Sequence, residues 1–184
     1  MRLRIGHTPA FDDVVVDTAA ERRIVFVGDA GTGKTTLCRF LARAWLASTR
    51  RRCAVIGTRP HEFDGLRVAH TDRSRYSSWG NGSELLVVVD DADGVPADLV
   101  CGLVRHRFGL VVLTSYGPAA RLLTDHGLVD RAYGLHRPRD TSAAGGELVQ
   151  ARLDWPLPLV DVVVDPRGPA DQPRHRWAIG SGAR

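Results

Sequence analysis

The sequence has 184 residues, which suits one ordinary domain and is long enough to bury a hydrophobic core. Its formal net charge is +4, with 25 basic side chains against 21 acidic ones, so charge alone does not indicate a nucleic-acid-binding protein. The three cysteines, Cys38, Cys53 and Cys101, are widely spaced and have no histidine at ligand spacing, which predicts buried thiols in a reducing compartment rather than disulfides or a zinc site. The first residues carry no apolar signal region, and no apolar run reaches membrane-spanning length, so we expect a cytoplasmic protein that meets a membrane only through a partner.

Strands and helices are predicted to alternate through most of the chain. In order, we expect strands at 13–17 and 23–28, a helix at 34–48, strands at 53–57 and, more weakly, 66–70, a loop at 72–83, a strand at 85–91, a helix at 96–107, a strand at 110–115, a helix at 118–127 and a strand at 131–135. The apolar runs at 23–28, 85–91 and 110–115 are typical of strands that are buried on both faces. The alternation predicts an α/β fold with a mostly parallel sheet.

The C-terminal part has a different composition. From Pro138 onward, prolines and glycines surround two candidate strands at 147–153 and 159–165, which we expect to form an antiparallel hairpin at an edge of the main sheet. Residues 166–184 are polar and rich in glycine and proline, which predicts a flexible tail. The domain is therefore predicted to span residues 1–165.

The segment GDAGTGKTT, residues 28–36, contains Lys34, the single lysine among the 25 basic side chains. It matches the phosphate-binding pattern G-x-x-x-x-G-K-[ST], known as Walker A. Glycines let backbone N–H groups turn toward a phosphate, and the following helix directs its positive N-terminus at the same anion. Lys34 reaches the β- and γ-phosphates as a compact charge where a flat guanidinium would be too wide, and Thr35 offers its hydroxyl to Mg²⁺. The residues predicted to bind ATP are Gly28, Asp29, Ala30, Gly31, Thr32, Gly33, Lys34, Thr35 and Thr36.

Two carboxylates, Asp90 and Asp91, end the apolar strand at 85–91, as the acidic residues of a Walker B motif do. We expect Asp90 to hold Mg²⁺ through water. Asp91 stands where many ATPases carry the Glu that polarises the attacking water, but its side chain is one methylene shorter. The alternative is a strand-to-helix turn in which aspartate caps the next helix. Thr114, at the end of the next strand, is either a sensor of the γ-phosphate or an ordinary loop residue.

Together these motifs resemble an FtsK/SpoIIIE-type ATPase domain, including the ATPase modules of type VII secretion motors, over residues 3–165. The segment 5–36 is similar to the opening of that family, in which a short strand pair precedes the phosphate-loop strand. LLVVVDDAD resembles the secretion-motor Walker B motif, where Asp-Asp or Asp-Tyr often replaces Asp-Glu, and LVVLTSYGPAAR resembles the sensor strand, with Thr114 on the family's threonine. The Gln and Arg that commonly follow this threonine in the DNA pumps are Ser115 and Tyr116 here.

The resemblance implies a P-loop NTPase three-layer sandwich of the RecA/FtsK-like kind, with small β additions at both ends. It also implies a Mg·ATP-binding and ATP-hydrolysing module, a minimal motor for DNA or protein translocation. Such a module would assemble into a ring or join a larger motor or membrane complex, and a neighbour's arginine, for which Arg121 is a candidate, would complete the site. The charge leaves a DNA contact open, and the motif does not distinguish ATP from GTP.

Two other functions compete with the motor. A regulatory or docking subunit that binds ATP but hydrolyses it poorly is favoured by Asp91 and by the absence of the transmembrane, winged-helix and tandem ATPase segments of these motors. A small-molecule kinase would usually place an acid at the end of the strand next to the phosphate-loop strand and would carry an arginine-rich lid. VIGTRP, residues 55–60, contains the end of the strand at 53–57 and offers no acid directly at the strand end.

Overall fold

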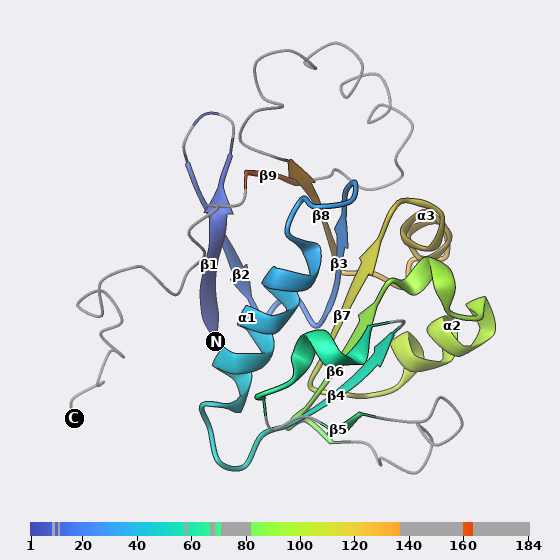
Figure 1. Ribbon diagram of the computed structural model, residues 1–184. Coiled ribbons are helices and arrows are strands. Elements are labelled where there is room, and N and C mark those ends of the chain that lie inside the picture. The colour runs from blue at the N-terminus through green and yellow to red at the C-terminus, as the bar shows by residue number, and fades with distance from the viewer. Residues whose placement is uncertain are drawn as a thin grey trace.

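A mostly parallel β-sheet forms the middle layer of the molecule (Figure 1). The computed structural model describes residues 1–8, 10, 12–57, 59–66, 69–70, 82–136 and 160–163. Within these residues the strands are β1 (Arg2–His7), β2 (Asp13–Asp17), β3 (Arg23–Val27), β4 (Arg52–Gly57), β5 (Ala69–His70), β6 (Leu85–Asp90), β7 (Leu110–Ser115), β8 (Arg131–His136) and β9 (Val160–Val163). The helices are α1 (Lys34–Leu46), α2 (Ala97–Arg105) and α3 (Pro118–Asp125), together with the short 3₁₀ helices η1 (Pro60–Phe63) and η3 (Ala92–Gly94).

The strand order is β2-β1-β9-β8-β3-β7-β6-β4-β5. The five strands from β8 to β4 are all parallel to their neighbours, and β7 lies between β3, which leads into the phosphate loop, and β6, which ends in the acidic pair. β5 extends the sheet at one edge, and the antiparallel pair β1–β2 extends it at the other. The structure therefore confirms the α/β fold with a mostly parallel sheet and β additions at both ends.

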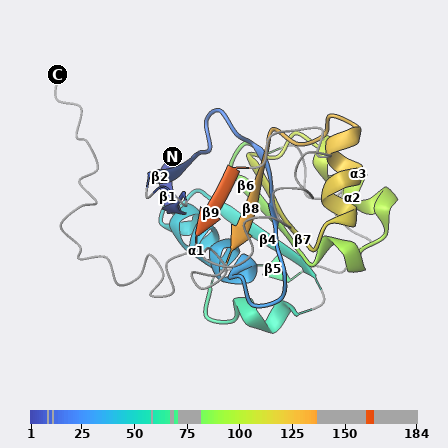
Figure 2. The same cartoon turned by 90° about the horizontal axis from the view of Figure 1, so that it is seen from above.

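Helices cover both faces of the sheet (Figure 2). On one face, α1 buries Leu37, Leu41 and Trp45 against the strands, and on the other, α2 and α3 bury residues such as Leu103 and Leu123. β6 and β7 are buried at every position, as expected for strands that are covered on both sides. Because alternate side chains of each strand point to opposite faces, one continuous apolar run serves both cores. This gives the predicted three layers.

One expectation for the minor strands was wrong. We expected 159–165 in an antiparallel hairpin at the sheet edge, but β9 lies inside the sheet, parallel to β8 and antiparallel to β1. Val162 is fully buried there, and an apolar strand of this kind gains more by burial between two neighbours than at a solvated edge. The weak strand predicted at 66–70 is confirmed in part, because the structure contains β5 at Ala69–His70. The candidate strand 147–153, most of the predicted loop 72–83 and the predicted tail 166–184 lie outside the described residues.

The prediction of three buried thiols is confirmed in part. Cys38 and Cys53 are buried and Cys101 is half-buried, and all three are free. Burial raises the pKa of the Cys53 thiol to about 12, and burial also raises that of Cys38 well above its ordinary value. Neither group therefore ionises near neutral pH. In the described part of the chain, none of the helices combines the length and apolar character that a bilayer crossing requires.

Candidate functional site

The phosphate loop runs from the end of β3 to the start of α1, and two of its glycines are required by its shape. A Cβ at Gly28 would lie 2.7 Å from the Leu135 carbonyl oxygen, so only glycine fits between the loop and β8. Gly33 has a φ of 92°, in the left-handed region that favours glycine, and directly precedes α1. The first turn of α1 contains no acidic residue, and no described side chain caps it. Its amides and the positive end of its dipole are thus available to an anion.

Lys34 is a nearly buried cation inside this loop. Its side chain is 8% exposed, and its ammonium group donates hydrogen bonds to the carbonyl oxygens of Gly28 and, at 2.9 Å, Asp29. The ammonium nitrogen also lies 4.1 Å from the centroid of the Tyr116 ring. Burial lowers the pKa of Lys34, and the carboxylates of Asp29, Asp90, Asp91 and Asp93 act in the opposite direction. The loop therefore holds a positive charge at the position where the motif requires one.

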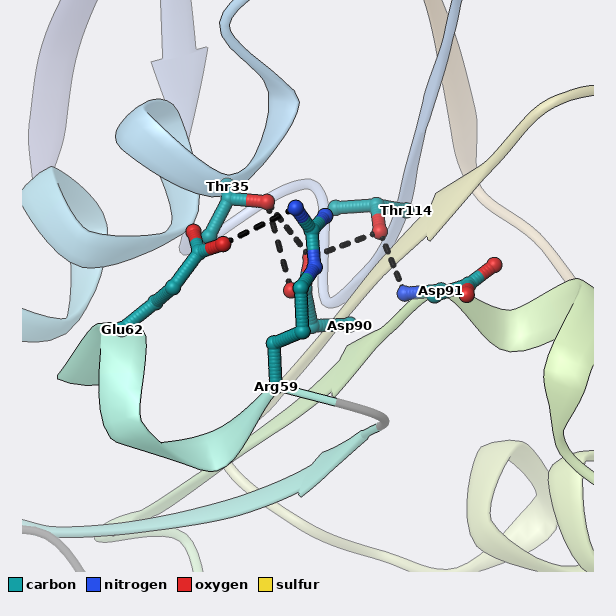
Figure 3. A network of polar contacts seen from close by, with 6 residues as sticks. All are labelled: Thr35, Arg59, Glu62, Asp90, Asp91 and Thr114. Carbon is teal, nitrogen blue, oxygen red and sulfur yellow. Dashed lines mark hydrogen bonds and ion pairs between the residues drawn. The ribbon is translucent and has the colours of Figure 1, made fainter. Parts of the chain in front are cut away.

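Asp90 joins three elements at the carboxyl ends of the strands (Figure 3). Its carboxylate is 1% exposed and accepts hydrogen bonds from Thr35 Oγ1 of α1, at 3.0 and 3.2 Å, and from Thr114 Oγ1 of β7, at 2.9 Å. Three residues that the sequence singled out separately are thus in direct contact.

The chemistry of this cluster fits a magnesium ion. A hydroxyl and a carboxylate are oxygen ligands of the kind that Mg²⁺ prefers, and this ion commonly keeps several waters and completes its coordination with substrate phosphates. The described residues contain no group of three or more His, Cys, Asp or Glu side chains that could hold a metal ion by themselves. Thr35 and Asp90 could therefore hold Mg²⁺ together with phosphate oxygens and water.

Asp91 has an unusual backbone conformation. Its φ and ψ are both 61°, and it is the only non-glycine residue with positive φ in the described part of the chain. Its N–H donates to Thr114 Oγ1 at 2.7 Å. In Figure 3 its carboxylate extends away from Thr35 and Asp90. Its side chain makes no capping hydrogen bond to η3, so Asp91 is not the helix cap that the alternative prediction required.

The capping residue is instead Asp93, which the sequence analysis did not single out and which caps α3. Its carboxylate accepts hydrogen bonds from Ser115 Oγ at 3.0 Å, the Tyr116 N–H at 2.6 Å and the Ala119 N–H at 2.8 Å. Asp93 thereby ties η3 to the end of β7 and to the first turn of α3. An aspartate near two strand ends was visible in the sequence, but its partners depend on how β6 and β7 pair.

A cavity of about 200 Å³ opens beside these groups. Its lining residues are Ala30, Gly31, Gly33, Lys34, Thr35, Thr36, Arg59, Glu62, Asp91, Thr114 and Tyr116. Most were predicted from the motifs. Of the predicted site residues, Gly28, Asp29, Thr32 and Asp90 do not line the cavity. Thr32 Oγ1 stabilises the loop by donating to the Asp29 carbonyl oxygen at 2.9 Å.

Sequence reasoning missed two charged residues of the cavity, Arg59 and Glu62. They form an ion pair, with Arg59 Nη1 2.9 Å from Glu62 Oε1. Arg59 directly precedes η1, and Glu62 is the third of the four residues of this helix, which lies just beyond β4. No motif marks them, because the segment TRPHEF has neither a strand-end acid nor a regular apolar period.

The solved structures that are similar to this chain include two ATPase structures. One is the cytoplasmic domain of the type VII secretion ATPase EccC of Thermomonospora curvata, with a TM-score of 0.53 and 18% identity over 77% of this chain and 22% of that one. The other is EccC from the same organism (ATPases 2 and 3) in complex with a signal sequence peptide, with a TM-score of 0.52 and 15% identity over 77% of this chain and 35% of that one.

These likenesses confirm the predicted resemblance at the level of the fold, which is that of the ATPase domains of type VII secretion motors. No protein-family model and no curated protein sequence matches the chain. This chain spans at most about a third of the length of the two structures.

Proposed function

We propose that this chain is an FtsK/SpoIIIE-type ATPase module that binds Mg·ATP in the cavity and hydrolyses it. The observation that carries the proposal is the meeting of Lys34, Thr35, Asp90 and Thr114 at the carboxyl ends of β3, β6 and β7. In open α/β sheets, ligands bind at this end of the strands. The likeness of the fold to secretion-motor ATPase domains supports the same assignment.

Each residue has a distinct part in this proposal. The loop residues 28–36 wrap the triphosphate with backbone N–H groups, and Lys34 leaves the carbonyl oxygens of its own loop for the β- and γ-phosphates. Thr35 and Asp90 hold Mg²⁺, which neutralises charge on the phosphates. Thr114 contacts both the Asp90 carboxylate and the Asp91 N–H, so a change at the γ-phosphate that moves Thr114 would reach both acids.

The strand order favours an ATPase over a kinase. The strand beside β3 on the acidic side is β7, which ends in Thr114 and Ser115, and the carboxylate of Asp90 is one strand further away on β6. A small-molecule kinase would usually carry its acid on the strand directly next to β3.

A docking or regulatory subunit that binds ATP without efficient turnover is the second candidate. The orientation of Asp91 favours it, because the carboxylate at the usual position of the catalytic Glu extends away from the cluster of Thr35 and Asp90 (Figure 3). In that case nucleotide binding would order the module for a partner rather than drive movement. The two candidates agree on binding and differ only in turnover.

The wider role is part of the same proposal. EccC is a type VII secretion ATPase, and its ATPases 2 and 3 were solved with a signal sequence peptide. By analogy, this module would act in the cytoplasm, assemble into a ring or join a larger motor or membrane complex, and take part in moving protein or DNA. Arg121, exposed on α3 and outside the cavity, is available to a neighbouring subunit as an arginine finger.

Phosphate release and molecular mass, each measured with and without nucleotide, test the proposal. We expect saturating Mg·ATP to raise the Tm, to be hydrolysed, and to increase the mass through self-association, with DNA added in a separate series and GTP run in parallel. Arg121→Ala should lower turnover only at concentrations where the assembly forms. Stabilisation by ATP without phosphate release would instead support the docking subunit, and no stabilisation by any nucleotide would reject both.

A further inference from the structure

The segment that follows β4 is held directly beside the Walker B carboxylate. Gly57, the last residue of β4, pairs with Asp90, the last residue of β6. A Cβ at Gly57 would lie 2.6 Å from the Asp90 carbonyl oxygen, so the two strand ends approach as closely as the backbone permits. Phe63 at the end of η1 is fully buried in the core under α1. The segment is therefore fixed at both ends, with Arg59 and Glu62 between them.

Glu62 has the surroundings of a functional acid. It lines the same cavity as Thr35 and Thr114, and in Figure 3 its carboxylate reaches from η1 toward Thr35. Its side chain is 28% exposed, whereas that of Arg59 is 49% exposed, so the ion pair has its carboxylate on the inner side. The ion pair favours the Glu62 rotamers that keep its carboxylate beside Arg59.

Asp91 is held in a different way. Its backbone amide is committed to Thr114 Oγ1, and its left-handed conformation directs the carboxylate away from Thr35 and Asp90. A general base must lie within hydrogen-bond reach of the water it deprotonates. Both residues line the cavity, but Glu62 has the longer side chain, and its carboxylate is the one that reaches toward Thr35, a predicted Mg²⁺ ligand (Figure 3).

We propose that Glu62, rather than Asp91, is the general base of ATP hydrolysis, and that Arg59 is its positioning residue. This inference rests on the proposed ATPase function. In the reaction, the Glu62 carboxylate takes a proton from water as the water oxygen forms a bond to the γ-phosphorus. The bond between that phosphorus and the β–γ bridging oxygen breaks, ADP leaves with the electron pair, and the proton passes to phosphate or solvent. No oxidant or further reactant is needed.

The central experiment compares three amide substitutions under saturating Mg·ATP. Glu62→Gln should lower kcat about 100-fold or more and leave the Kd for Mg·ATP within about threefold, because removal of a general base typically costs 10²–10⁴ in rate. Asp91→Asn should lower kcat less than Glu62→Gln does. Asp64→Asn, which changes an exposed carboxylate of the same segment that does not line the cavity, is the matched control and should keep the parental kcat.

Two further measurements separate a base from a structural carboxylate. Formate should restore part of the kcat of Glu62→Ala by supplying a small carboxylate, and it should not restore Lys34→Ala. Arg59→Ala should lower kcat about tenfold, Arg59→Lys should recover part of the loss, and Arg59→Ala should cause no further loss in a Glu62→Gln background. Losses that multiply in the double variant would contradict the positioning role, since independent sites are additive.

The possible failures can be told apart. If the parent protein hydrolyses ATP and Glu62→Gln retains kcat within threefold, the inference about Glu62 is wrong and the proposed ATPase stands. If the parent protein binds ATP but releases no phosphate, the docking function holds and Glu62 is not a base. If the parent protein binds no nucleotide, the proposed function itself is wrong.

Discussion

The choice of lysine at position 34 has a physical reason that the structure makes concrete. Elsewhere the sequence uses arginine for positive charge, yet the group inside the phosphate loop is an ammonium that donates to two backbone carbonyls and lies over an aromatic ring. A guanidinium is planar and wider, so the same position would not accommodate it without opening the loop. Size, rather than charge, therefore distinguishes Lys34 from the arginines that make up the rest of the 25 basic side chains.

We predict that both Lys34→Ala and Lys34→Arg abolish stabilisation by Mg·ATP. The first removes the charge and the second keeps it in the wrong shape. At a nucleotide concentration 100 times its Kd, the parent protein should gain about 2.7 kcal/mol of unfolding free energy, and both variants should gain almost none. Differential scanning fluorimetry with and without nucleotide measures this. A Lys34→Arg protein that responds like the parent would show that charge alone suffices.

We predict that Asp90→Asn weakens nucleotide binding in Mg²⁺ more than in EDTA. The amide still accepts a hydrogen bond from Thr35 or Thr114 but no longer offers a negative charge to a cation. Calorimetric titration of ATP under both conditions gives the two affinities. Thr35→Ser keeps the hydroxyl and should preserve the Mg²⁺ preference, which makes it the matched control. Equal weakening in both conditions would assign Asp90 a structural role.

At the level of elements, the turn between β6 and α2 is joined to the turn between β7 and α3 by one carboxylate. Asp93→Ala removes the acceptor for the Ser115 hydroxyl and for two backbone amides, that of Tyr116 just before α3 and that of Ala119 in its first turn. We predict a loss of about 1–2 kcal/mol in unfolding free energy, the usual cost of deleting a helix cap. Urea denaturation measures it, and Asp98→Ala, in the first turn of α2, provides a comparison. An equal effect of the two substitutions would argue against the bridging role of Asp93.

The sequence predicted those elements whose pattern is local. β6 and β7 are apolar at consecutive positions because both of their faces are covered, and α1 shows its buried residues at helical spacing. The position of β9 could not be predicted, since its neighbours β8 and β1 are distant in the chain and a short valine-rich strand suits an edge or an interior. Arg59 and Glu62 were missed for the same reason: the pairing of Gly57 with Asp90 brings their segment to the cavity.

For the whole molecule, composition determines the response to alkaline pH. Arginine stays protonated throughout the accessible range, so the groups that titrate above pH 8 are mainly thiols, phenols and a single lysine. Burial raises the pKa of Cys53 to about 12, and burial with a hydrogen bond to Glu21 raises that of Tyr133. In the unfolded chain a thiol ionises near pH 8.5. Between about pH 9 and pH 12 the unfolded state loses protons that the folded state keeps, so stability falls as pH rises.

We predict that Cys53→Ala makes this decline shallower. Each thiol of this kind contributes about 1.4 kcal/mol per pH unit within the window, and the substitution removes one. Urea denaturation at pH 7, 9 and 10.5 gives the slope. Val55→Ala, on the same strand and equally buried, is the control: it should lower stability at every pH and leave the slope unchanged. Parallel slopes for the parent and Cys53→Ala would contradict the prediction.

The place of β9 in the sheet has a consequence for synthesis on the ribosome. Among the described strands β1 emerges first and β9 last, yet the two are neighbours, with β9 between β1 and β8. Domains begin to fold while the chain is still being made. A nascent chain arrested before residue 160 therefore carries two open strand edges, on β1 and on β8, with unpaired backbone groups of the kind that recruit other chains. Quality control of this protein would then depend on how quickly translation delivers β9.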